Sequence, residues 1–219
     1  LEVGKVGFKP GMYMASTDEM HITVVGKGGH AALPEKYNNP IIAASQLIIA
    51  LNDYFSNIKD FPCVFAIGYI NAMGSTNVIP DEVKLKGTFR AMNETFRADA
   101  LKKMKEISNK IASNFNLTIN FNIKNGFPYL ENDIVLTKKS LKLSKEYLGK
   151  ENVIELPLRM TGEDFSYFAL EKPSCFYRLG TRNENLGIVH GLHTSKFNVD
   201  ENSIKIGMGL MAYIALKSI

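Results

Sequence analysis

Three groups of polar side chains in this sequence could take part in chemistry. His193 lies in a loop between a predicted strand and the last predicted helix, a common place for a metal ligand or an acid–base catalyst. Asn77 and Arg90 flank one predicted strand, so both could point into one cleft. Glu163 and Asp164 are adjacent carboxylates that could cap a short helix or face a cationic site. Taken alone, each has an ordinary alternative: an exposed Asn, a solvated Arg, or a loop histidine bonded to the backbone.

Two predicted strands and their turn must position Asn77 and Arg90. The run from Pro62 to Ala72 is rich in Val, Ile, Phe and Tyr, and Gly74 and Pro80 mark the turn that follows it. From Glu82 the sequence alternates, as a half-buried strand requires. One face carries the apolar set Val83, Leu85, Gly87 and Phe89, and the other carries Lys84, Lys86, Thr88 and Arg90.

The whole pattern around this hairpin predicts a ferredoxin-like unit of the α+β class. The order is strand, helix, strand, strand, helix, strand, which is the βαββαβ unit with a four-stranded antiparallel sheet and two helices on one face. It occupies about residues 18–127. On the first helix, Ile42 and Ile49 form a second apolar line that this core does not need, which indicates a subunit interface. On the second helix, about 94–114, five basic residues including Arg97 indicate a solvated face.

The remainder of the chain, about 128–219, predicts a partial α/β domain. Helices are expected near 133–148, 165–170 and after Asp200, with strands near 153–156 and 174–179. Too few strands follow Pro128 to close a core of normal size, so this domain lacks a piece. Residues 1–17, read as loop with one short strand, belong to the preceding part of the same domain. His190, three residues before His193, is read as a bystander because irregular backbone fixes no pair geometry.

Composition narrows the classes of function. The chain is 45% hydrophobic and 22% charged, and its net charge of +4 comes from acidic and basic residues that are interspersed. This is an ordinary globular composition without a nucleic-acid signature. Cys63 and Cys175 lie at no metal-like spacing and are expected to be buried free thiols, which favours a cytoplasmic location. No secretory leader pattern is present, and the apolar run 206–216 is too short to cross a membrane. The start on Leu1 indicates a fragment.

Four spaced segments together resemble one enzyme family. They are GKGGHAALP, GSTNVIPDEVKLKGTFR, MTGEDFSYF and GLHTSKFNVDE, in this order along the whole chain. They are similar to the zinc-dependent amidohydrolase and carboxypeptidase family, and most similar to its hippurate hydrolase and N-acyl-amino-acid amidohydrolase branch. That family inserts a ferredoxin-like lid domain into an α/β catalytic domain, which agrees with the predicted elements.

The resemblance implies a role for five residues. His30 corresponds to the lid histidine that reaches into the active site of the partner subunit and stabilises the oxyanion. Asn77 and Arg90 correspond to lid residues that hold the substrate, Arg90 through its carboxylate. His193 corresponds to a metal ligand. Gly162, in MTGEDF, corresponds to a pocket wall that allows close backbone approach.

The resemblance also has departures. Glu35 and Asn39 stand where the branch usually has His and Asp, which leaves the acyl preference open. The family's other metal ligands and its general base precede the point where this chain begins. The complete enzyme is therefore expected to use two divalent metal ions, zinc with manganese or cobalt as alternatives, and this chain alone to bind none and to be inactive.

The sequence thus favours the lid and the C-terminal catalytic part of a homodimeric, metal-dependent enzyme that hydrolyses the amide bond of N-acyl amino acids or small peptides. The alternative is a non-catalytic dimerisation or ligand-binding module that kept the lid. A ferredoxin-like RNA binder is disfavoured, because the aromatic RNP signature and a basic sheet face are missing.

Overall fold

The computed structural model describes residues 1–218 and divides into two compact units. The first, here called the ferredoxin-like unit, comprises Met14–Leu130 and Met160–Asp164. The second, called the three-stranded unit, comprises Leu1–Tyr13, Glu131–Arg159 and Phe165–Ile219. Each unit has its own hydrophobic core, and each is described here by itself.

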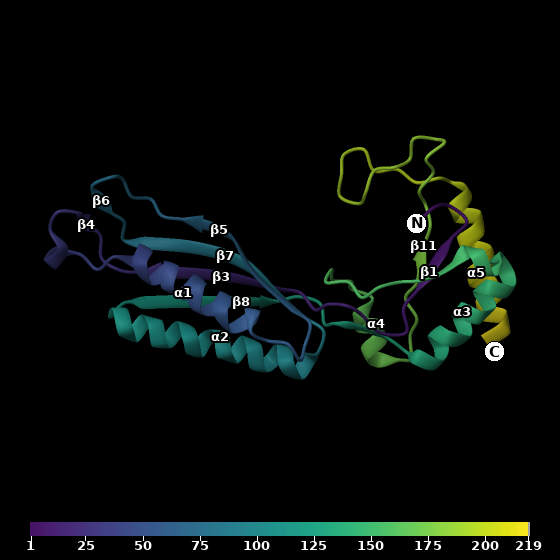
Figure 1. Cartoon of the computed structure of the whole chain (residues 1–219), viewed down its shortest axis with the longest axis horizontal. Coiled ribbons are helices and arrows are strands. Elements are labelled where there is room, and N and C mark those ends of the chain that lie inside the picture. Colours follow the sequence, from purple (N-terminus) through teal and green to yellow (C-terminus); the bar gives the residue numbers. More distant parts are fainter. Residues whose placement is uncertain (219) are drawn as a thin grey trace. The chain divides into compact units, whose positions relative to one another are not determined.

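The ferredoxin-like unit has the fold that the sequence predicts. Its sheet has the order β5-β7-β3-β8, and every neighbouring pair is antiparallel. Helices α1 and α2 cover one face of this sheet (Figure 1). The elements are β3 (Asp18–Val25), α1 (Pro40–Ser56), β5 (Cys63–Asn71), β7 (Glu82–Ala91), α2 (Glu94–Phe115) and β8 (Thr118–Asn125).

Alternation and helix caps explain these elements. On β7 the apolar residues that face the helices are buried, whereas Lys84 and Lys86 are exposed on the other side. Because successive strand residues point to opposite faces, this pattern sets the register of the whole strand. Helix α1 begins at the N-cap Asn39, whose side chain accepts the N–H of Ile41. Helix α2 begins in the same way, with Asn93 as its N-cap.

The three-stranded unit is built on a mixed sheet of order β10-β1-β11. Strand β1 pairs in parallel with β10 and antiparallel with β11. Helices α3 and α5 supply Leu143, Leu210 and Ile214 to its core. The elements are β1 (Val6–Phe8), α3 (Ile134–Leu148), the short 3-10 helix η2 (Lys150–Asn152), β10 (Val153–Glu155), α4 (Ser166–Glu171), β11 (Arg178–Leu179) and α5 (Asn202–Ser218).

Several details differ from the sequence-based expectations. Residues 1–17 contain two strands, β1 and β2 (Gly11–Met14), and β2 pairs with β9 (Leu130–Asn132). The strand expected over 174–179 is only two residues long. Residues 160–164 group with the ferredoxin-like unit, whereas the sequence-based division had put them in 128–219.

Two expectations about solvent and membrane can also be compared with the structure. Cys63 and Cys175 are free thiols, but both are half-buried rather than buried. Burial nevertheless raises the pKa of each thiol above its usual value. Within residues 1–218, no helix has the length and apolarity needed to cross a membrane.

Candidate functional site

His30 and Asn77 are brought together at one end of the ferredoxin-like unit. The short strand β4 (Gly29–His30) pairs antiparallel with β6 (Val78–Ile79). One residue further, the N–H of Ala31 donates to the carbonyl of Asn77 at 2.9 Å. The side chains of His30 and Asn77 are both exposed. Two loops that are far apart in sequence therefore present a histidine and an amide side by side.

At this end of the unit the backbone of Gly28 lies close to that of Ile79, and a hydrogen bond to His30 indicates which ring nitrogen carries the proton. Gly28 has no room for a side chain, because a Cβ there would lie 2.6 Å from the carbonyl oxygen of Ile79. Its N–H donates to the carboxylate of Asp81 at 2.8 Å, which fixes the turn. The Nδ1 atom of His30 accepts the N–H of Ala32 at 3.1 Å. In the neutral imidazole the proton must then be on Nε2, so that atom is a hydrogen-bond donor directed away from the backbone.

Arg90 lies at the opposite end of β7 from His30 and Asn77. Strand β7 begins at Glu82, directly after the loop that carries Asn77, and Arg90 is its penultimate residue. At the usual rise per residue, Glu82 and Arg90 are about 26 Å apart. Within one copy of the chain, Asn77 and Arg90 are therefore too far apart to line the same cleft, so a shared cleft would require two copies. Both residues belong to one hairpin, but they occupy its two ends.

The basic residues of β7 differ in their partners. Lys84 forms an ion pair of 2.7 Å with Glu82, and the ammonium of Lys86 lies 5.2 Å from the ring centre of Tyr69. Arg90 is half-buried, and within the described residues its guanidinium has no hydrogen bond or ion pair. A guanidinium that is partly desolvated and keeps its donors free is suited to a ligand carboxylate. Lys84 and Lys86 therefore each have a side-chain partner, whereas the guanidinium of Arg90 has none within the described residues.

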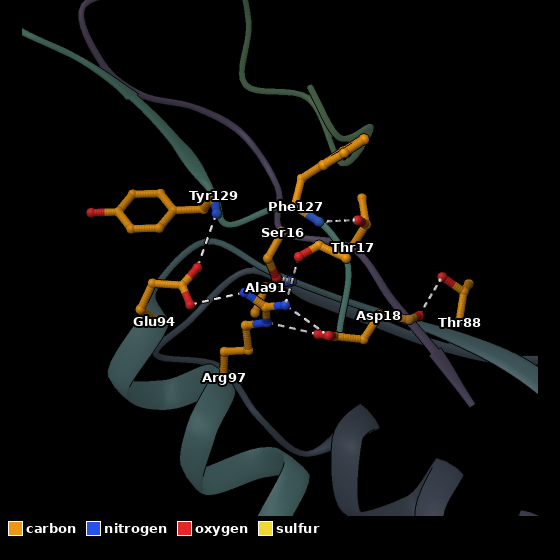
Figure 2. A network of polar contacts seen from close by, with 10 residues as sticks. Ser16, Thr17, Asp18, Thr88, Ala91, Glu94, Arg97, Phe127 and Tyr129 are labelled. Atoms are coloured by element: carbon orange, nitrogen blue, oxygen red, sulfur yellow. Dashed lines mark hydrogen bonds and ion pairs between the residues drawn. The ribbon is translucent and has the colours of Figure 1, made fainter. Parts of the chain in front are cut away.

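A buried polar network lies next to the Arg90 end of the sheet (Figure 2). The guanidinium of Arg97 donates to both carboxylate oxygens of Asp18, at 2.8 and 2.7 Å. It also donates to Glu94 at 2.9 Å and to the carbonyl of Gly126 at 3.4 Å. The other oxygen of Glu94 accepts the N–H of Tyr129 at 3.0 Å. The network thus ties the start of α2 to the start of β3 and to the segment after β8.

Further bonds fix the backbone on both sides of Arg90. Thr88 donates its hydroxyl proton to the carbonyl of Asp18 at 3.2 Å. Ala91 donates its N–H to the hydroxyl of Ser16, and the N–H of Ser16 donates back to the carbonyl of Ala91 at 2.8 Å. The strand residues two before and one after Arg90 are therefore anchored.

This network is not predicted by the sequence patterns, and the expectation that Arg97 lies on a solvated face is wrong. Arg97 is only 7% exposed and Asp18 only 1%. Burial lowers the pKa of Arg97, but the hydrogen bond and the charge of Asp18, with those of Glu94, raise it by more. A signal was present: Asp18 has the same strand parity as the buried Met20, and Arg97 falls on the apolar stripe of α2.

Gly162 lies beside Arg90. The segment that contains it is held to the ferredoxin-like unit by Ala15, whose N–H donates to the carbonyl of Thr161 at 3.1 Å. A Cβ on Gly162 would be 3.3 Å from Nη1 of Arg90. Of its two acidic neighbours, Asp164 is exposed, and neither of them is the N-cap of α4, which is Phe165.

His193 belongs to a loop of the three-stranded unit. Its φ of 63° is in the left-handed region, which a residue with a side chain rarely adopts, and the residue is exposed. The neighbouring His190 lines a pocket of about 410 Å³ together with Arg178 and Val189. Backbone strain of this kind is common at functional sites, so it supports a role for His193 without identifying it.

A metal site needs several ligating side chains close together. In the part of the chain that the structure describes, no group of three or more His, Cys, Asp or Glu side chains is close enough to hold an ion. A catalytic zinc site needs about three protein ligands. His193 could supply at most one of them.

Comparison with known proteins gives a consistent result. The peptidase dimerisation domain matches residues 16–116. N-acetyldiaminopimelate deacetylase of Lactobacillus acidophilus is 32% identical over 212 residues, which are 95% of this chain and 54% of the relative. N-acetyl-L-cysteine deacetylase of Bacillus subtilis is 34% identical over 206 residues, which are 93% of this chain and 48% of the relative.

A solved structure agrees with these relatives. A Bacillus subtilis protein described as a dinuclear metal binding peptidase of the M20 family superposes with a TM-score of 0.77 at 25% identity. The match covers 100% of this chain and 54% of that one. The chain thus spans about half the length of the curated relatives and of the solved structure that it matches.

Proposed function

The chain belongs to the M20 metallopeptidase family, and on that premise we propose that it is the lid and part of the catalytic domain of a metal-dependent amidohydrolase. The complete enzyme hydrolyses the amide bond of N-acyl amino acids or small peptides. The relatives named above are deacetylases of N-acetylated amino acids, which supports this substrate class.

The separation of His30 and Arg90 is the observation that carries the proposal. Both residues belong to the ferredoxin-like unit: His30 lies at the end where β7 begins, and Arg90 lies near the other end of β7, about 26 Å from Glu82 at the first end. This is much longer than the distance between the amide carbonyl and the carboxylate of one N-acyl amino acid. A single substrate molecule can therefore meet both side chains only if they come from two copies. This supports a homodimer in which each lid completes the site of its partner.

Each residue then has a chemical task. Arg90 anchors the substrate carboxylate, since its donors have no partner among the described residues. From the other copy, Nε2–H of His30 donates to the carbonyl oxygen as negative charge develops there. Asn77, next to His30, adds a neutral hydrogen-bonding group to the same end of the substrate.

The metal chemistry belongs to the complete enzyme. His193 is proposed as one ligand of a site with two divalent ions, zinc being the first choice. The other ligands and the general base would come from residues outside this chain. No hydrolytic step is therefore assigned to the chain alone, and incubating it with zinc, manganese or cobalt and N-acetyl amino acids should give no turnover above the blank.

The second candidate, a dimerisation or ligand-binding module without catalysis, is kept because no metal-ligand cluster is found among the described residues. The upstream coding sequence separates the two. A metal-ligating half joined to this chain supports the enzyme, and its loss from the gene supports the module. The two free cysteines are in keeping with a cytoplasmic protein under either alternative.

The proposed dimer has two candidate contact regions. On α1, Ile42 and Ile49 are 54% and 61% exposed, which is unusual for isoleucine. Strand β5 is an edge of the sheet and carries the exposed Tyr69 and Ile70. Either surface could pair with its copy across a two-fold axis. Light scattering should give a dimer at tens of micromolar, and a strict monomer would contradict this part of the proposal.

A two-by-two comparison tests the role of Arg90 in the complete enzyme. Parent and Arg90→Ala are assayed on an N-acetyl amino acid and on the same compound with its carboxylate capped as an amide. Because hydrogen bonds to charged groups contribute about 1.5–3 kcal/mol, kcat/KM for the free acid should fall by about tenfold to a hundredfold or more. The amide should be a poor substrate for both enzymes.

Two further variants sharpen this test. Arg90→Lys should be almost as impaired as Arg90→Ala, because an ammonium cannot form two parallel hydrogen bonds to a carboxylate. Lys86→Ala is the matched control on the same face and should change little. Equal losses on the acid and on the amide would mean that Arg90 supports the fold and does not contact the carboxylate.

A further inference from the structure

Thr17 is held in one orientation by the segment that follows β8. Its N–H donates to the carbonyl of Phe127 at 2.9 Å, and its own carbonyl accepts the N–H of Gly126 at 2.7 Å. Its side-chain hydroxyl accepts the N–H of Phe127 at 2.8 Å. A threonine has few rotamers, and one that also has its hydroxyl bonded has a fixed methyl group. The position of the Thr17 methyl is therefore determined by the backbone on which it sits.

That methyl group is packed against Gly162. A Cβ on Gly162 would overlap Cγ2 of Thr17 and would lie 3.3 Å from Nη1 of Arg90. Gly162 is not among the glycines with a positive φ, so its backbone conformation does not require glycine. What requires glycine is the close approach of Thr17 on one side and of the Arg90 guanidinium on the other.

Arg90 has little else to hold its guanidinium. Within residues 1–218 this guanidinium has neither an ion pair nor a hydrogen bond, in contrast to that of Arg97, which donates to two carboxylates and a carbonyl. The backbone of Arg90 is anchored through its strand neighbours, but its long side chain has many rotamers. Packing against Gly162 is a contact that can select among these rotamers.

We infer that Thr17 is a positioning residue for Arg90 and acts through Gly162. The Thr17 methyl sets how closely the Gly162 backbone lies against the unit, and that backbone sets where the guanidinium rests with its donors free. The inference deepens the proposed function and rests on it, since the value of this placement is the capture of a substrate carboxylate. Thr17 itself does not touch the substrate.

The position of Arg90 can be measured without any ligand. In the 219-residue chain, the Nε–Hε resonance of Arg90 is assigned by its loss in Arg90→Lys. Gly162→Ala should shift this resonance, because the added methyl displaces the neighbouring guanidinium. Thr17→Ser removes the overlapping methyl and keeps the hydroxyl, so the double variant Gly162→Ala/Thr17→Ser should return the resonance toward that of the parent. An unchanged resonance in Gly162→Ala, or no return in the double variant, overturns the inference.

A second measurement covers the case in which Gly162→Ala does not fold. Thr17→Ser and Thr17→Val separate the methyl from the hydroxyl. If the methyl positions Arg90, Thr17→Ser shifts the Arg90 resonance and Thr17→Val, which keeps a methyl at that place, does not. If Thr17 only joins two backbone segments through its hydroxyl, Thr17→Val has the larger effect, and the inference is overturned.

Ligand titration distinguishes failure of this inference from failure of the proposed function. The probes are N-acetyl-L-alanine and its primary amide. The affinity of the chain for the acid should fall about tenfold in Gly162→Ala, the equivalent of one charge-assisted hydrogen bond, and recover in the double variant. If the parent binds acid and amide equally while the resonance follows the expected pattern, the carboxylate role of Arg90 fails and the positioning role of Thr17 stands.

Discussion

The two units of this chain differ in how much apolar surface they bury. The core of the ferredoxin-like unit contains fifteen buried hydrophobic residues among the described ones, drawn from strands β3 and β7 and from both helices. The core of the three-stranded unit contains five, although the unit has three helices and a sheet. Apolar burial is the main favourable term in folding, so the two units should differ strongly in stability.

The two units also differ in how many large apolar side chains they expose to solvent. In the three-stranded unit, Val135, Phe168, Met208 and Leu216 are each at least 69% exposed. In the ferredoxin-like unit, only Met73 is exposed to that extent among the large hydrophobic residues that the structure describes. The most strongly exposed apolar side chains of the described residues are therefore concentrated in the three-stranded unit. The three-stranded unit thus has helices and a sheet but buries little apolar surface between them.

The buried ion pair should give the largest effect and would test the ferredoxin-like side of this comparison. Asp18→Ala leaves the Arg97 charge buried without its main partner, so the free energy of unfolding should fall by about 3–5 kcal/mol. Glu106→Ala removes half of an exposed pair with Lys103 and should cost at most about 1 kcal/mol. Urea denaturation of both variants measures the difference. A loss below 1 kcal/mol for Asp18→Ala would mean that the network is not a stabilising element.

A pair of truncations compares the two units directly. Leu51 is completely buried between α1 and the sheet, so Leu51→Ala should lower the free energy of unfolding by about 2–5 kcal/mol. Met208 on α5 is 69% exposed, and Met208→Ala should change it by no more than about 0.5 kcal/mol. Both are measured on the 219-residue chain by urea denaturation. A large loss for Met208→Ala would show that α5 buries this face in solution, and the contrast between the units would then be wrong.

Matched helix caps provide a smaller and more local test. Asn93 accepts the N–H of Phe96 at the start of α2, and Asp133 accepts the N–H of Leu136 at the start of α3. Replacing either cap with Ala should cost about 1 kcal/mol. Because α3 belongs to the less buried unit, Asp133→Ala should bring its amides to rapid hydrogen exchange, whereas α2 should remain protected in Asn93→Ala. Equal protection of both helices would contradict the proposed difference in stability.

The smallest expected effect is a pH dependence at the start of α5. Asp200 accepts hydrogen bonds from the side chain of Asn183 and from the backbone and side chain of Asn202, in that order of influence, and these lower its pKa. A lowered folded-state pKa means that the stabilisation is present above the ordinary aspartate pKa of 3.8 and is lost as the pH falls through the folded-state pKa. Asp200→Ala should therefore weaken the protection of the α5 amides from hydrogen exchange at pH 7. The difference in protection between variant and parent should shrink below about pH 4. A constant difference across this range would mean that the carboxylate charge has no part in it.

Local patterns were sufficient for the fold of the ferredoxin-like unit. The alternation from Glu82 to Ala91 sets which side of β7 is buried, and the stripe of α1 sets which side of that helix faces the sheet. These periodicities follow from the geometry of a strand and of a helix, so they can be read from neighbouring residues alone. The order of the elements then restricts the topology to a few arrangements, and the ferredoxin-like one is confirmed.

The sequence by itself therefore determined the main elements of the ferredoxin-like unit, most of the faces they bury and the ferredoxin-like class, and its family resemblance named the candidate residues His30, Asn77, Arg90, Gly162 and His193. It could not determine which of these residues meet. Tertiary structure decided that His30 joins Asn77, that Arg90 lies at the other end of β7 beside Gly162, and that Arg97 is paired with Asp18, 79 residues away. The physical reason is that periodicity gives the direction of a side chain from its own element, whereas its partners depend on distances between elements that the chain closes only when it folds.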